Sequence, residues 1–117
     1  MKEEKNYIQM RKGVLEMCIL SVISGKEVYT SDILKTLKKA DLVVVEGTIY
    51  PLLSRLKNDG QLSYRWEESL SGPPRKYYQL TEAGQELLDE LSKNWFGLLA
   101  SVNQIMNKKN TPDENNC

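Results

Sequence analysis

The sequence predicts a mainly α-helical fold with one small β-hairpin: a winged helix-turn-helix followed by a long C-terminal helix. Apolar residues recur at helical spacing in three segments before residue 60. Two tyrosine-containing segments on either side of a Gly-Pro-Pro run then favour a pair of strands. Helical spacing returns after residue 81 and continues to about residue 107. The order helix, helix, helix, wing and long helix describes this fold class.

Composition narrows the range of functions. The chain has 117 residues, which suits one compact domain. Lys plus Arg and Asp plus Glu number 16 each, so the net charge of zero neither favours nor excludes a nucleic-acid partner. Histidine is absent and the cysteines are Cys18 and Cys117, which excludes imidazole bases and the usual zinc-ligand clusters. We therefore expect no catalytic residues, no metal site, no cofactor and no enzymatic activity.

The same composition favours a cytoplasmic protein. Cys18 lies in an apolar run and is expected to be a small core residue, while Cys117 ends a polar tail, so no disulfide is expected. The longest apolar stretch, Met17–Ile23, is far shorter than the ~20 residues that a membrane-spanning helix needs. The first residues carry charges but no apolar signal-peptide segment. We expect a cytoplasmic location and no membrane partner.

The first predicted helix covers about residues 7–23. Apolar residues there recur at steps of three and four and stop at Ser24-Gly25. The second half of this segment is apolar almost all round, so a helix there needs neighbours on more than one side. We expect it to be the central element of the fold.

A second, shorter helix is predicted over Asp32–Ala40, with Thr30 or Ser31 as its cap and Asp32 in its first turn. Its inward-facing residues are expected to be Ile33, Leu34 and Leu37. Its exposed C-terminal end carries Lys35, Lys38 and Lys39.

The third helix is predicted from about Glu46 to Asp59, after an apolar connector over residues 41–45. Asn58-Asp59-Gly60 stops it. Pro51 is expected in about the first turn, where a missing backbone N–H costs little. In a helix-turn-helix, such a pair of helices places one helix in the major groove of DNA.

A two-stranded hairpin is predicted next, over Gln61–Glu67 and Lys76–Leu80. Residues 69–74 separate the strands and contain a glycine and two prolines, so we expect a loop too long for a tight turn. Thr81 then caps a final helix that runs to about Asn107. These elements divide the chain into a winged helix-turn-helix DNA-binding domain over residues 1–80, a dimerisation helix over 81–107 and a disordered tail over 108–117.

The final helix carries an apolar seam that repeats at steps of three and four, as in a coiled coil. Its members are Leu88, Leu91, Trp95, Leu98, Val102 and Ile105. A chain of this length has too little core to bury so long a helix alone. We expect it to pair with its copy in a homodimer, with the first helix beside it through Met10 and Val14. A two-fold dimer would present two recognition helices to a pseudo-palindromic operator.

Hydroxyl and cationic side chains on the third helix, the second helix and the wing form the candidate DNA-binding set, because each can donate a hydrogen bond to a phosphate or a base edge. Its members are Ser31, Lys35, Thr48, Tyr50, Ser54, Arg55, Lys57, Arg75 and Lys76. The alternative is an ordinary solvated surface. A further alternative is that Glu67 and Glu68 share the wing tip and repel phosphate.

Four segments together resemble the PadR family of transcriptional regulators: Gly13–Leu20, Gly47–Leu56, Asp59-Gly60 and Arg75–Gly84. The resemblance covers about residues 8–106. It implies a dimeric winged-helix repressor with the third helix in the major groove and the wing on the flanking backbone. The residues at matching motif positions are Thr48, Tyr50, Ser54, Arg55, Arg75 and Lys76.

The short chain is similar to the smaller PadR subfamily, which includes a multidrug-sensing repressor. That resemblance aligns Trp95 with a tryptophan that lines a pore at the dimer interface and stacks on flat aromatic drugs. It implies a small aromatic or cationic ligand, although a tryptophan that simply fills the seam is equally compatible with the sequence. Two departures from the family pattern stand out: Pro73 replaces a frequent basic residue, and Val45-Glu46 replaces a Ser-Pro cap, which leaves an acid close to DNA.

The leading hypothesis is therefore a homodimeric DNA-binding repressor whose affinity falls when an aromatic ligand changes the dimer geometry. The alternative is a winged-helix module that binds protein and not DNA, with the final helix pairing to a foreign helix.

Overall fold

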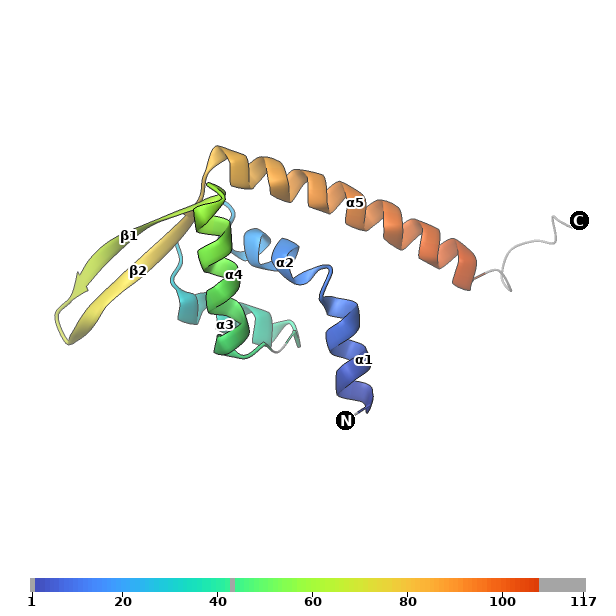
Figure 1. Ribbon diagram of the computed structural model, residues 1–117, viewed down its shortest axis with the longest axis horizontal. Helices are drawn as coiled ribbons and strands as arrows, with labels where there is room; N and C mark the ends of the chain where they lie inside the picture. Colours follow the sequence, from blue (N-terminus) through green and yellow to red (C-terminus); the bar gives the residue numbers. More distant parts are fainter. Residues whose placement is uncertain (1, 43, 108–117) are drawn as a thin grey trace, which may run out of the picture.

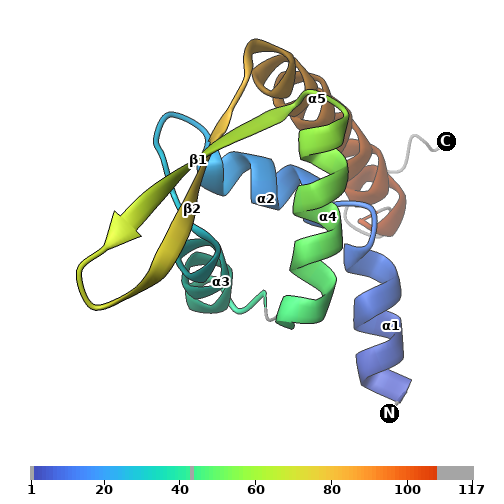
Figure 2. The same cartoon turned by 60° about the vertical axis from the view of Figure 1, so that its left-hand side comes forward.

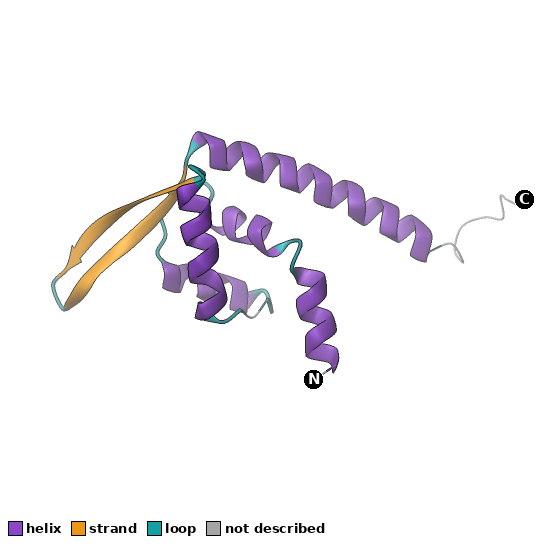
Figure 3. Cartoon of the chain, in the orientation of Figure 1, coloured by secondary structure: helices purple, strands orange, loops and turns teal. Residues whose placement is uncertain are grey.

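The computed structural model describes residues 2–42 and 44–107, and it confirms the predicted fold class. The elements, labelled in Figure 1 and coloured by type in Figure 3, are in chain order α1 (Lys2–Arg11), α2 (Leu15–Ile23), α3 (Thr30–Lys39), α4 (Glu46–Asn58), β1 (Leu62–Ser69), β2 (Gly72–Leu80) and α5 (Glu82–Met106). The predicted disordered tail lies outside the described residues.

Helix α2 is the centre of the fold, as its apolar sequence predicts. Figure 2 shows it between α3 below and α5 above, with α4 beside it. Ile19, Leu20 and Ile23 are completely buried. Their partners in the core include fully buried residues of α3 and α4, namely Ile33, Ile49, Leu53 and Leu56. Burial of each such side chain contributes about 1.5–3 kcal/mol.

The helix predicted over residues 7–23 is in fact two helices. Helix α1 ends at Arg11, a turn closed by the Val14 N–H on the Arg11 carbonyl follows (3.0 Å), and α2 begins at Leu15. Gly13 lies in this turn, and glycine in a helix interior costs about 1 kcal/mol relative to alanine. The apolar spacing continues across the break, which is why the sequence suggested one helix. In Figure 1, α1 projects away from the core.

The start of α3 and the place of Pro51 in α4 differ from the sequence prediction, whereas α4 begins at Glu46 as predicted. Helix α3 begins at Thr30, so Tyr29 occupies the cap position, and the Asp32 carboxylate accepts a hydrogen bond from the Tyr29 N–H at 3.2 Å. Pro51 is the sixth residue of α4, one turn further in than predicted. The carbonyl left without a proline N–H belongs to Gly47, which is exposed, so water can satisfy it.

The predicted long loop of the hairpin is wrong. The strands pair as far as Ser69 opposite Gly72, which leaves a two-residue turn at Leu70-Ser71. Pro73 and Pro74 lie in β2 opposite an irregularity of register between Glu67 and Ser69. A two-stranded ribbon leaves the outer edge of each strand unpaired, so β2 accommodates prolines that a central strand would exclude.

The junction between α4, β1 and α5 requires a glycine at position 84. The Thr81 hydroxyl caps α5 by accepting from the Gly84 N–H at 3.1 Å, and it donates to the Gly60 carbonyl at 2.6 Å. A Cβ on Gly84 would lie 2.0 Å from the Gln61 carbonyl oxygen. A carbon and an oxygen atom that are not bonded to each other cannot approach so closely. Only glycine therefore lets the first turn of α5 pack against the Gln61 carbonyl.

Beyond this junction, α5 extends away from the core, as Figure 1 shows. Ser24 of α2 donates a hydrogen bond to the Gln85 side chain at 2.9 Å, and Leu88 is buried. From Leu98 onward the seam residues are exposed. Within the part of the chain that the structure describes, no helix is both long and apolar enough to cross a membrane.

Gly84→Ala is expected to destabilise the fold by about 2–3 kcal/mol, because the added methyl group forces α5 away from the Gln61 carbonyl. The matched control is Gly47→Ala in α4, where a Cβ meets nothing within 4 Å. There alanine should be neutral or stabilising by about 0.5 kcal/mol. Urea unfolding followed by circular dichroism measures both, and equal stability of the two variants would contradict the close-approach argument.

Candidate nucleic-acid interface

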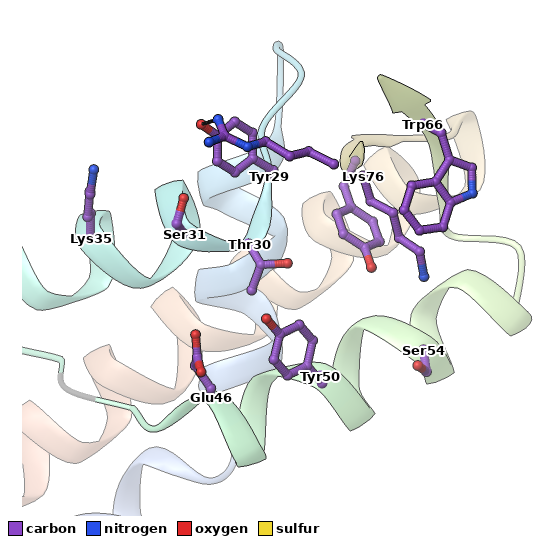
Figure 4. A pocket seen from close by; sticks show the side chains of 11 residues that line it. Tyr29, Thr30, Ser31, Lys35, Glu46, Tyr50, Ser54, Trp66 and Lys76 are labelled. Atoms are coloured by element: carbon purple, nitrogen blue, oxygen red, sulfur yellow. Dashed lines mark hydrogen bonds between the residues drawn. The ribbon is translucent and has the colours of Figure 1, made fainter. Parts of the chain in front are cut away.

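A groove of about 600 Å³ lies between α3, α4 and the wing formed by β1 and β2. Figure 4 shows its side chains converging from these elements. The residues that line it are Tyr29, Thr30, Ser31, Lys35, Glu46, Tyr50, Ser54, Trp66, Arg75, Lys76 and Tyr78. Aromatic rings, hydroxyls and cations thus share one open surface.

Helix α4 contributes one stripe of residues to this groove. Glu46, Tyr50 and Ser54 follow each other at four-residue steps and therefore lie above one another on one side of the helix. The opposite side of α4 carries its buried residues, Ile49 and Leu53, which pack in the core. Packing thus fixes which polar residues of α4 face outward.

The wing is anchored to the connection between α2 and α3 by an arginine. Arg65 donates to both oxygens of the Glu27 carboxylate, at 2.8 and 2.9 Å. These hydrogen bonds lower the pKa of Glu27 from its ordinary value and raise that of Arg65. Val28 and Tyr78 exchange backbone hydrogen bonds at 3.0 and 2.6 Å, which adds a second attachment. The wing root is therefore held in a defined position.

Arg75 lies at the side of the groove that Tyr29 forms. Its guanidinium stacks 4.8 Å from the centre of the Tyr29 ring and donates a hydrogen bond to the Tyr29 hydroxyl. Tyr77 packs edge-on against the same ring at 4.9 Å. These contacts orient Arg75 while leaving it exposed to solvent, where other guanidinium donors remain available.

Lys76 is held on the opposite side of the wing by two aromatic rings. Its ammonium group lies 4.4 Å from the centre of the Tyr64 ring and 5.3 Å from that of Trp66. Lys57 of α4 lies 5.5 Å from the Tyr64 ring centre. Trp66 is 60% exposed, so this group of cations and rings reaches the surface. Such cation–π contacts contribute about 0.5–1 kcal/mol each at exposed sites.

Six residues of the candidate DNA-binding set come together in the groove. They are Ser31, Lys35, Tyr50, Ser54, Arg75 and Lys76. Lys57 lies beside the groove over Tyr64. Glu67 and Glu68 are not among the lining residues; Glu67 pairs across the strands with Arg75 and forms an ion pair with Arg65 at 2.5 Å.

The structure places Thr48 and Arg55 on another side of α4. Both line a separate depression next to α1 and α2. The Arg55 guanidinium pairs with Glu16 of α2 and lies 3.7 Å from the Asp59 carboxylate. Each step along a helix turns about 100°, so Ser54 and Arg55 point in different directions although both are exposed.

The groove also contains residues that the sequence did not single out. Tyr29 and Thr30 enter it because α3 starts earlier than predicted. Trp66 enters it because strand alternation places its side chain on the same face as Lys76, its cross-strand partner. That alternation was the available signal, but it required the register of the hairpin.

The predicted dimer and ligand residues lie on α5, on α1 and, for Val14, in the turn between α1 and α2, and they range from buried to exposed. Leu88 is buried, whereas Leu91, Trp95 and Val14 are half-buried. Leu98 is 58% exposed, Val102 40% and Met10 79%. Among the described residues, no group of three or more acidic or cysteine side chains could hold a metal ion.

Comparison with known proteins gives one consistent family. The model of the transcriptional regulator PadR-like family matches residues 19–90. A PadR-like transcription factor from Bacteroides fragilis is 54% identical, with a TM-score of 0.73 over 86% of this chain and 98% of its own. A PadR family regulator from Eggerthella lenta is 30% identical, with a TM-score of 0.80 over 88% and 90%. A PadR-like regulator from Bacillus cereus is 41% identical, with a TM-score of 0.73 over 84% and 96%.

Proposed function

Because the chain belongs to the PadR-like family of transcriptional regulators, we propose that it is a homodimeric repressor that binds double-stranded DNA at a pseudo-palindromic operator. The observation that supports this proposal is the groove between α3, α4 and the wing, where hydroxyl donors from two helices face outward beside Lys35, Arg75 and Lys76. In this proposal residues 1–80 are the winged helix-turn-helix DNA-binding domain and α5 is the dimerisation helix.

In this proposal, α4 enters the major groove with its outward stripe toward the base edges. Arg75 and Lys76 contact phosphates on the flanking backbone, where their donors and positive charge strengthen binding without reading sequence. Arg55 is assigned a different role, because its ion pair with Glu16 holds α4 against α2. Thr48 lies beside it and is likewise outside the direct contact set.

Lys76→Ala is expected to weaken DNA binding and to lower the slope of log affinity against log salt by about one, because one phosphate contact is lost. The control is Lys26→Ala, an exposed cation at the turn after α2, which should leave the slope unchanged. Arg55→Ala should also keep the slope while lowering the free energy of unfolding.

Fluorescence anisotropy of the labelled DNA upstream of the protein's own gene, at several salt concentrations beside a scrambled duplex, measures these slopes. An unchanged slope for Lys76→Ala would remove this residue from the contact set. Equal, weak binding to both duplexes by the unaltered protein would favour the alternative function, a winged-helix module that binds protein.

The dimer rests on the exposed seam of α5 together with α1. Among the described residues, the apolar side chains of Leu98, Val102 and Met10 have no neighbours that bury them. Exposed apolar side chains that share one helix face are typical of an interaction surface. Pairing of two α5 helices along the seam, with α1 of each chain packed beside them, would remove these side chains from water. A two-fold dimer then matches a two-fold DNA site.

Leu98→Glu combined with Val102→Glu is expected to convert the protein to a monomer at micromolar concentration, because two charges enter the centre of the seam. DNA affinity should fall with it, since only one recognition helix remains per molecule. The control is Gln104→Glu, an exposed change outside the seam, which should leave the dimer intact. Sedimentation velocity measures the mass, and a dimeric double variant would contradict the proposed interface.

We further propose that Trp95 forms part of a ligand site at the dimer centre. It is half-buried and lies between the packed and the exposed parts of the seam. Two symmetry-related indoles could sandwich a planar aromatic or cationic molecule by stacking and cation–π attraction. A ligand that prefers one spacing of the two α5 helices would oppose DNA binding if the operator requires another.

Planar aromatic cations are expected to quench the fluorescence of Trp95 and to release labelled operator DNA. The chain has two tryptophans, so Trp66→Phe leaves Trp95 as the single reporter. Trp95→Ala should bind DNA but lose the response to ligand. A Trp95→Ala variant that still releases DNA on ligand addition would refute the site.

A further inference from the structure

Glu46 is the one acidic residue that lines the groove. The charged residues around it are cations, namely Lys35, Arg75 and Lys76. A carboxylate in a surface that faces phosphates lowers affinity by repulsion unless it meets a hydrogen-bond donor. DNA offers such donors only on its bases, so the position of Glu46 relative to the base edges decides its role.

Glu46 lies at the start of the proposed recognition helix. It is the first residue of α4 and heads the stripe that continues with Tyr50 and Ser54. In Figure 4 its carboxylate rises from the first turn toward the same open space as the Tyr50 side chain. Within helix-turn-helix proteins, the N-terminal residues of the recognition helix contact base edges. Glu46 therefore occupies a place from which a side chain reaches bases and not phosphates.

The carboxylate of Glu46 is also available for a partner. No lysine or arginine among residues 5–42 and 44–107 forms an ion pair with it, in contrast to Glu16 and Glu27, which pair with Arg55 and Arg65. The helix dipole favours an acidic residue in the first turn of α4, so it explains why this position carries an acid. It does not explain why the carboxylate faces the groove. If Glu46 only stabilises the helix start, its substitution should leave base preference unchanged. If it contacts a base, substitution should change the preference at one position.

We propose that Glu46 is a specificity-determining residue that accepts a hydrogen bond from the exocyclic amino group of a cytosine in each operator half-site. In the major groove cytosine presents a donor, whereas guanine and thymine present acceptor oxygens that repel a carboxylate. Adenine carries a donor next to the N7 acceptor, so it suits an amide better than a carboxylate. Glu46 thus favours cytosine and acts against the other bases at one position. This inference rests on the proposed DNA-binding function.

The test compares the unaltered protein with Glu46→Gln, Glu46→Ala and the control Glu82→Gln. Glu82 is exposed in the first turn of α5, so the control changes the same charge at another helix start, away from the groove. Selection from a randomised duplex library gives the half-site. Anisotropy then measures affinity for duplexes that carry each of the four bases at each half-site position, and thermal unfolding verifies that all variants fold.

The unaltered protein and Glu82→Gln should prefer cytosine at one position by roughly five- to tenfold over guanine and thymine. Glu46→Gln should shift the preference at that position toward adenine. Glu46→Ala should lose the cytosine preference at that position and keep the preferences at all others. It should also bind the scrambled duplex more tightly, because a charge that repels phosphate has been removed.

The same base preference at every position for all four proteins would overturn the inference while leaving the proposed function intact. A uniform loss of affinity in Glu46→Ala with unchanged preference would also overturn it, since it indicates a role in the helix start only. Failure of the unaltered protein to select any sequence would instead refute the proposed function, and with it this inference.

Discussion

The burial of α2 is the constraint on which the rest of the structure depends. Ile19, Leu20 and Ile23 are inaccessible to solvent because α3, α4, α5 and the wing surround this helix. An isolated nine-residue helix of this composition would not be stable in water, because short helices gain most of their stability from packing. The elements that cover α2 are also those that bear the groove and the apolar seam of α5. One apolar segment therefore positions both surfaces.

Helix α4 both packs in the core and presents polar side chains to the groove. Its buried residues, Ile49 and Leu53, fix the rotation of the helix about its axis. Once that rotation is set, Tyr50 and Ser54 must face the groove and Arg55 must face α2, where Glu16 binds it. The ion pair between these exposed groups contributes about 0–1 kcal/mol, so it adds a little stability to an orientation that core packing sets. The direction of the outward stripe is thus a consequence of core packing.

Apolar spacing alone predicted where most of the helices lie. It did not predict the break between α1 and α2 or the length of the hairpin strands. The spacing through Gly13 is continuous, so only the preference of glycine for non-helical backbone could indicate the break. Pro73 and Pro74 suggested a loop because they lack an N–H, yet on the outer edge of a ribbon no N–H is required. Strand pairing therefore extends further than composition implied.

The candidate site was predictable in its chemistry but not in its boundaries. Exposed hydroxyls and cations can be identified from apolar spacing, because the buried face of each helix is known. Which of them share a groove depends on how α3 and the wing pack against α4. Tyr29 illustrates this: it lies before α3 in sequence, but it orients Arg75 of the wing across the groove. Such contacts between distant segments leave no periodic pattern.

The attachment of α5 to the domain bears on how a signal at the seam could reach DNA. The Thr81 hydroxyl is bonded to the Gly60 carbonyl, Gly84 lies against Gln61, and Ser24 is bonded to Gln85, so the first turns of α5 cannot tilt without moving the end of α4. A closely packed junction transmits displacement instead of absorbing it. A change of crossing angle between two α5 helices would therefore rotate each winged domain as a unit. In the proposed dimer, the distance between the two α4 helices would then follow from the geometry of the seam, and the proposed ligand response would need no flexible element within the domain.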